Sequence, residues 1–298
     1  MTNDENLTKL ARALLLTLCL AALGGCSLIR VGYSHFDTFA EWTADDYFDL
    51  DAQQKQEFRS RFGRLHEWHR YEQLPDYAAF LTETKARVQK GLAREDVLWI
   101  IGNTSTRYRT LVGHVAYDAA ALLMTVTPAQ LEALQRQWGK DNRRFVRDHR
   151  LEESAEEQRR VAAQRALERV RGWTGSLSDE QEERITALAR VMPMNQRLRH
   201  EDRLRRQREF LQLLSQRGDA RQFTERLRHW LSHWEEGRDP EYARLYEDWE
   251  QKQADLYVTM SRMLTPQQRA AVLRRVQSYI DDFTRLAQRP DAPAPANR

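Results

Sequence analysis

Apolar residues recur every three or four positions along most of the chain, which is the spacing of one face of an α-helix. The pattern predicts helices over residues 95–124, 223–234, 242–263 and 272–286. After Pro128 the chain has no proline and a single glycine, Gly139, as far as Arg171, which predicts one long helix over 127–171 with a kink at the glycine. No segment alternates between apolar and polar residues, so no strand is expected. The pattern predicts an all-α protein, a bundle of long helices arranged as helical hairpins.

The composition supports helices and a polar surface. Charged residues make up 31% of the 298 residues, and the mean hydropathy is −0.77, yet 41% of the residues are apolar, which is enough for a core. Only 12 glycines and 8 prolines are present, fewer than a turn-rich β protein needs. The 47 basic and 44 acidic residues are interspersed, which indicates solvated helix faces with ion pairs. A nucleic-acid partner is therefore not expected.

The first residues carry the features of an export signal. Residues 13–25 form an apolar run of thirteen, whereas a transmembrane helix needs about 20. Residues 23–26, LGGC, resemble the lipobox of bacterial lipoproteins, in which the cysteine is acylated and becomes the new N-terminus. We therefore expect residues 1–25 to be a signal peptide that is removed, with Cys26 as the lipid anchor; a plain signal peptide or a short anchor helix is the alternative. Cys19 is the other cysteine, so the mature chain would contain no free thiol, which suits the periplasm.

Two segments flank the expected folded part. Residues 26–44 are assigned to the lipid anchor and a short tether. By the sorting rule known for bacterial lipoproteins, an aspartate directly after the acylated cysteine favours retention in the inner membrane. That residue is Ser27 here, so we expect the protein to be anchored in the outer membrane and to face the periplasm. The tether contains aromatic residues at helical spacing, for which core packing is favoured over contact with lipid headgroups: Phe36, Phe39 and Trp42. The proline- and alanine-rich residues 289–298 predict a disordered tail.

Four short stretches share one pattern: an aliphatic residue, then Asp, Ser or Thr, then two residues and a glutamine. They occur at residues 50–54, 126–130, 177–181 and 264–268. The pattern is that of a capping box, in which the first polar side chain caps a helix and the glutamine three residues later binds back to the cap residue. The predicted cap and glutamine residues are Asp51 and Gln54, Thr127 and Gln130, Ser178 and Gln181, and Thr265 and Gln268.

The repeated pattern resembles the LTxxQ motif of the Spy-type periplasmic stress proteins, a family of all-helical chaperones that bind unfolded clients or partners. Members of that family have two such motifs each. The four motifs of this chain therefore predict two tandem helical units, at residues 45–172 and 173–288. A second resemblance covers residues 23–81: the chain is similar to an uncharacterised family of proteobacterial lipoproteins, a domain of unknown function. Its RxGY, Trp-then-Asp-Tyr and WHRxxxLP segments correspond here to Arg30–Tyr33, Trp42–Tyr47 and Trp68–Pro75.

Few residues suggest chemistry. His66 and His69 are one residue short of the spacing of an HExxH zinc site, and a packed helix face that uses both histidines in hydrogen bonds is the favoured interpretation. His229 and His233 have the i, i+4 spacing of a metal-binding face, but surface histidines are favoured. The chain has no recognised catalytic motif, so no catalytic residue, bound metal or cofactor is expected.

A cluster of large aromatic residues near the C-terminus is the remaining candidate: Trp230, Trp234, Tyr242, Tyr246 and Trp249. Two helices that meet in a hairpin at residues 237–240 would bury most of these rings in a core, which is the favoured interpretation, whereas rings left exposed would suit a client-binding surface. The resulting prediction is a non-enzymatic lipoprotein with a binding or chaperone-like role, whose partners are the membrane and either unfolded clients or an envelope protein. The alternatives are a scaffold subunit of an envelope assembly and a metal-dependent enzyme that uses His66 and His69. The sequence does not indicate an oligomeric state.

Overall fold

The computed structural model describes residues 28–289, so Cys26, the predicted signal peptide and all but the first residue of the predicted tail lie outside the described part. The all-α prediction is confirmed, since the described residues form helices and no strand. In chain order the elements are α2 (Leu28–Ser34), α3 (Phe36–Phe48), α4 (Ala52–Trp68), the π-helical turn η2 (His69–Gln73), α5 (Leu74–Lys90), α6 (Arg94–Leu123), α7 (Pro128–Asp148), α8 (Ala155–Thr174), α9 (Asp179–Arg190), α10 (Gln196–Ser215), α11 (Ala220–Ser232), α12 (Pro240–Met263) and α13 (Pro266–Leu286).

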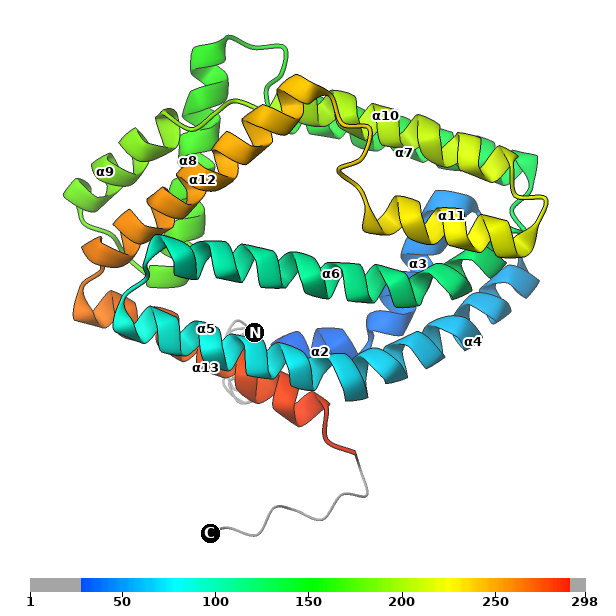
Figure 1. Cartoon of the computed structure of the whole chain (residues 1–298), viewed down its shortest axis with the longest axis horizontal. Coiled ribbons are helices and arrows are strands. Elements are labelled where there is room, and N and C mark those ends of the chain that lie inside the picture. The colour runs from blue at the N-terminus through cyan, green and yellow to red at the C-terminus, as the bar shows by residue number, and fades with distance from the viewer. Residues whose placement is uncertain (1–27, 290–298) are drawn as a thin grey trace, which may run out of the picture.

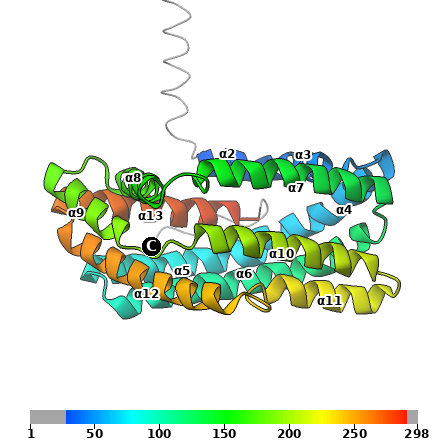
Figure 2. The same ribbon diagram turned by 90° about the horizontal axis from the view of Figure 1, so that it is seen from above.

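The helices form a broad, flat frame (Figure 1). α5 and α13 pack along one long edge, α7 and α10 along the opposite edge, and α6 runs between these edges. α8, α9 and α12 lie at one end of the frame, and α3, α4 and α11 lie at the other. Turned by 90°, the molecule is a much narrower slab (Figure 2). Within residues 28–289, no helix combines the length and the apolar character needed to cross a bilayer.

The buried apolar residues form several small clusters rather than one continuous core. The largest joins α6, α10 and α11 around Phe223, whose side chain is fully buried. A second lies between α6 and α12 and contains Val97, Ala254 and Val258. A third, made of Ala163, Ala166 and Ala189, joins α8 to α9. Small residues in this third cluster let the two helices approach closely, and the separate clusters leave room between them for a cavity.

The prediction of one helix over 127–171 is wrong, because α7 ends at Asp148 and α8 begins at Ala155. Arg150 adopts a left-handed conformation with φ 53°, and the amide of Leu151 donates to the carbonyl of Val146 at 3.1 Å, which is the Schellman pattern of a helix end. Glycine usually occupies that position, so the helix end could not be recognised from the sequence, which has an arginine there. Ser154 then caps α8 by accepting the Glu157 amide at 3.2 Å.

Two further expectations about packing also differ from the structure. α12 leaves the turn after α11 in a new direction instead of folding back along α11 as a hairpin (Figure 1). On α3, core packing of the aromatic residues was favoured, but Phe36, Phe39 and Trp42 are 44%, 61% and 68% exposed. α3 contains no buried residue, because it lies on the outside of α4 and α7.

Candidate functional site

The four capped motifs begin α4, α7, α9 and α13, and each forms a complete capping box. Their glutamines meet in two buried pairs, which sequence reasoning did not anticipate. Gln54 and Gln130 exchange Nε2–H to Oε1 hydrogen bonds at 3.1 and 2.5 Å, and Gln181 and Gln268 do the same at 2.9 and 2.9 Å. Each pair lies within one of the two predicted tandem units. That division itself stays a prediction, since helices of the two halves pack together.

Both glutamine pairs use the same set of hydrogen bonds. In each motif the glutamine Oε1 also accepts the backbone N–H of its own cap residue, at 3.0 to 3.1 Å. Each Nε2 donates to a backbone carbonyl two residues before the partner's cap; for example, Gln130 donates to Asp49 at 3.0 Å and Gln268 to Ser176 at 2.8 Å. Every polar atom of the four buried amides therefore has partners, as burial requires. The pairs fix helix starts at the two ends of the frame.

The segments that carry the lipoprotein resemblance join the N-terminal helices to the C-terminal one. Arg30 of α2 forms an ion pair at 3.1 Å with Asp282 of α13, a residue that is only 3% exposed. Arg70 donates to the carbonyl of Leu286 at 2.6 Å, close to the end of α13. Because a buried carboxylate is costly without a cation, Arg30 secures α2 against α13. This contact holds the start of the described chain against the body of the protein.

The two histidines proposed as weak metal ligands belong to this packed region. His69 Nδ1 shares a hydrogen bond of 2.9 Å with the hydroxyl of Tyr33, and the ring of Tyr33 lies 4.5 Å from that of His66. Burial lowers the pKa of both histidines and raises the pKa of Tyr33. Among the described residues no third His, Cys, Asp or Glu converges with them as a metal site would require. His69 is packed and hydrogen-bonded as the favoured interpretation expects, whereas the buried Nε2 of His66 has no hydrogen-bond partner among the described residues.

The five aromatic residues of the C-terminal cluster all line one cavity of about 880 Å³. The cavity lies among helices α7 to α12. Tyr242 is buried, at 4% exposure, which agrees with the expected core role, whereas the other four rings are half-buried. The rings form an edge-to-face and tilted series: Tyr242 and Tyr246 are 6.1 Å apart, and Tyr246 and Trp249 are 5.8 Å apart.

Seven arginines share the cavity wall with these rings, against one acidic residue, Asp202. The seven are Arg159, Arg165, Arg169, Arg199, Arg203, Arg206 and Arg238. Within the described residues, only Arg203 among these seven arginines has a carboxylate within ion-pair distance, that of Asp141 at 3.9 Å. Asp202 is paired with Arg205, outside the lining, at 2.7 Å. The cavity therefore carries a strong excess of positive charge.

Guanidinium groups lie over the aromatic faces. The Cζ atom of Arg206 is 4.0 Å from the ring centre of Trp230, and that of Arg238 is 4.6 Å from the ring centre of Tyr246. Burial lowers the pKa of Arg206, with the positive charge of Arg205 acting in the same direction. Two buried polar atoms of the lining residues, Arg238 Nε and Gln253 Oε1, have no hydrogen-bond partner among the described residues.

The arginines of the cavity were missed by sequence reasoning, which treated charged residues as solvated helix faces. A signal was nevertheless present on α10. Arg199, Arg203 and Arg206 follow one helix face, and the next position on that face is Phe210. A face that mixes arginines with a large aromatic residue is not a typical solvated face.

The fold and this cavity define an all-α protein with a cationic, aromatic-lined cavity. Residues 46–243 match the model of a family described as a family of unknown function, DUF6279, and this covers more than half of the chain, so the protein belongs to that family. No curated protein and no solved structure matches the chain. The matched range includes the Trp68–Pro75 segment and most of the cavity wall, and it begins after Cys26.

Proposed function

We propose that this protein is a lipid-anchored binding protein of the bacterial envelope, held in the outer membrane by acyl groups on Cys26, with a non-enzymatic, chaperone-like role in the periplasm. The observation that carries the binding role is the cavity with seven arginines and one aspartate on its wall. The anchor is supported by the apolar run at 13–25 and by the LGGC sequence at 23–26. The resemblance of the capped motifs to Spy-type proteins supports an unfolded polypeptide as the ligand.

The chemistry of the cavity wall indicates which polypeptides bind. Guanidinium groups form paired hydrogen bonds with carboxylates, and their planar faces and the aromatic rings favour apolar and aromatic side chains. A cavity with uncompensated arginines repels basic segments, since like charges in a partly dehydrated site cost several kcal/mol. The preferred client is therefore an extended segment that combines acidic with aromatic or aliphatic residues.

We expect the purified full-length chain to slow the aggregation of unfolded client proteins in a charge-dependent manner. Light scattering would be followed after dilution of two denatured model proteins of similar size, one acidic and one basic, with and without an equimolar amount of the chain. The acidic client should aggregate more slowly in its presence, and the basic client should change little. Equal behaviour with and without the chain for both clients would contradict the proposed role.

A further inference from the structure

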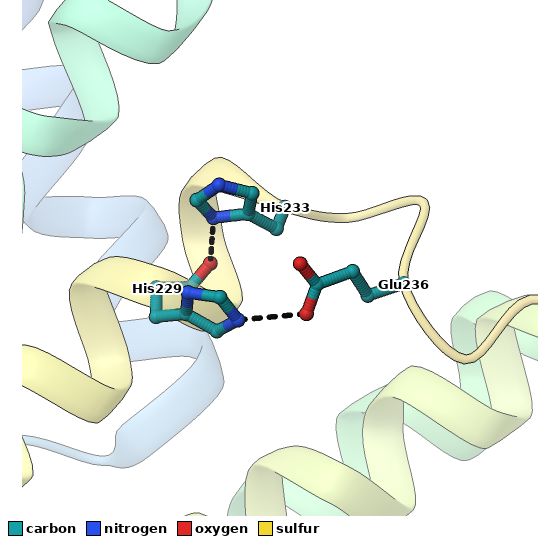
Figure 3. A group of neighbouring side chains, drawn as sticks. All are labelled: His229, His233 and Glu236. Atoms are coloured by element: carbon teal, nitrogen blue, oxygen red, sulfur yellow. Dashed lines mark hydrogen bonds and ion pairs between the residues drawn. The ribbon is translucent and has the colours of Figure 1, made fainter.

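The last turn of α11 and the loop behind it place three metal-binding side chains together on the surface. His229 and His233 lie one helical turn apart, and Glu236 reaches back from the loop toward them (Figure 3). One ligand atom from each of the three residues lies within 4.8 Å of those of the others. Among the described residues, no other group of three His, Cys, Asp or Glu side chains brings its ligand atoms this close together. We propose that these residues form a binding site for a divalent transition-metal ion of the Zn²⁺ type.

The hydrogen bonds around the site hold its side chains together. His233 Nδ1 lies 3.1 Å from the carbonyl oxygen of His229, on the side of the ring that faces the other two residues, and an ion bound by this nitrogen would replace that contact (Figure 3). His229 Nε2 lies 2.7 Å from the carboxylate of Glu236, a contact that an ion bound between these two ligands would replace. The two imidazole rings are nearly parallel, with centres 4.3 Å apart.

The donor set and its surroundings indicate the kind of ion. Two imidazoles and one carboxylate suit Zn²⁺, Cu²⁺ or Ni²⁺, whereas Mg²⁺ and Ca²⁺ prefer oxygen ligands alone. The side chains of His229 and Glu236 are 57% and 56% exposed, so water can complete the coordination. The site also lies at the C-terminal end of a helix, where the helix dipole favours a cation.

The loop of residues 233–239 connects this site to the cavity. It carries Trp234 and Arg238, which line the cavity, while Glu236 faces the histidines. An ion bound by Glu236 and α11 would therefore hold the loop, and with it part of the cavity wall, in place. This consequence rests on the proposed binding function of the cavity, whereas the metal site itself does not.

The site is tested by titrating Zn²⁺ into the full-length chain, purified without a histidine tag, by isothermal titration calorimetry. We expect one ion per chain, and His229→Ala and Glu236→Gln should each weaken binding by at least about tenfold. His35→Ala removes another exposed histidine and should leave the affinity unchanged. The absence of Zn²⁺ binding, or equal affinities of the His229→Ala and His35→Ala chains, would overturn the assignment.

A second inference rests on a different observation, the exposed aromatic face of α3. Phe36, Phe39 and Trp42 recur every three residues and fall within about 120° of the helix circumference. They are 44–68% exposed, and Val31 of α2 adds another exposed apolar side chain at 46%. Beside them runs a shallow apolar groove that includes Ala40, Ala44 and Phe48.

The start of the described chain indicates what covers this face. α2 begins at Leu28, and the two residues between it and the apolar run at 13–25 span at most about 7 Å. α2 and α3 are therefore close to the membrane whether Cys26 is acylated or the apolar run itself is the anchor. Aromatic residues, tryptophan above all, are favoured at the boundary between headgroups and acyl chains. We infer that this face lies on the bilayer and acts as a second attachment beside the N-terminal anchor.

This inference rests on the proposed membrane anchor, and one experiment separates the two. The full-length chain is incorporated into phosphatidylethanolamine–phosphatidylglycerol vesicles, and quenching of tryptophan fluorescence by lipids brominated near the headgroup is measured. Trp42→Phe should remove most of the quenchable fluorescence, while Trp173→Phe, which alters a 41% exposed tryptophan on α8, should not.

Each other outcome has a definite meaning. A chain that does not associate with the vesicles contradicts the proposed anchor. A bound chain in which Trp42→Phe leaves the quenching unchanged overturns the inference about α3. A bound chain that is also dimeric and shows no quenching at Trp42 assigns the face to a second copy, which overturns it as well.

Discussion

Replacing Gln130 by leucine is expected to lower the free energy of unfolding by about 3–5 kcal/mol. The leucine fills the space but binds none of the groups that the amide satisfies. The Gln54 amide loses its hydrogen bonds to Gln130, the carbonyl of Asp49 loses its donor, and the N–H of Thr127 loses its acceptor. A buried polar group without a partner costs about 1–3 kcal/mol. Urea unfolding of the full-length chain in detergent, followed by circular dichroism, measures the change.

Two comparisons make this prediction specific. Gln135→Leu alters an exposed glutamine on the same helix and should change the free energy of unfolding by less than about 0.5 kcal/mol. The double change Gln54→Leu with Gln130→Leu should cost less than the sum of the two single changes, because it removes both halves of the pair. The prediction is wrong if Gln130→Leu and Gln135→Leu have the same effect. Gln268→Leu should behave like Gln130→Leu, since the second pair repeats the same bonds.

Reversing two charges on the cavity wall, with Arg169→Glu and Arg199→Glu together, is expected to weaken binding of an acidic client peptide by about a hundredfold or more. Both side chains are exposed and, within the described residues, neither has an ion-pair partner, so the fold should tolerate the change. Each reversal replaces attraction by repulsion, and a tenfold loss per site corresponds to about 1.4 kcal/mol. Fluorescence anisotropy of a labelled peptide measures the affinity.

Arg208→Glu provides the matched control for this experiment. It makes the same charge change on α10, at an exposed position outside the cavity. Residue 208 lies nine positions after Arg199, which places it on the opposite face of the helix. If Arg208→Glu weakened binding as much as the change at Arg199, the peptide would be responding to the net charge of the protein rather than to the cavity.

Most of the fold could be predicted from local sequence signals. The helix over 95–124 is α6 to within a residue at each end, and the residues in the four capped motifs are the N-caps of α4, α7, α9 and α13. Both signals are local, since periodicity and capping depend on residues within one or two turns. The break after Asp148 was missed because Arg150 takes a position that glycine usually marks, although Ser154 and Glu157 formed a readable capping signal.

The features that depend on distant parts of the chain could not be predicted in this way. The periodicity of a helix shows which face is apolar but not which helix covers it. The pairing of Gln54 with Gln130 joins residues 76 apart, and the cavity combines residues of six helices, α7 to α12. The aromatic residues of α3 have the spacing of a core face, yet they remain 44–68% exposed in the described structure. The aromatic cluster was visible in the sequence, but the arginines that give the cavity its charge are distributed over α8, α10 and the α11–α12 loop.

The central claim, that the cavity binds acidic, aromatic polypeptide segments, is tested most directly by comparing three labelled peptides with the unmodified full-length chain. One peptide of about a dozen residues alternates acidic with aromatic residues, the second replaces the acids by lysine, and the third replaces the aromatic residues by serine. Because the wall combines guanidinium groups with aromatic rings, the first should bind at least about tenfold more tightly than either of the others. Equal affinities for the three peptides, or tightest binding of the lysine peptide, would contradict the claim.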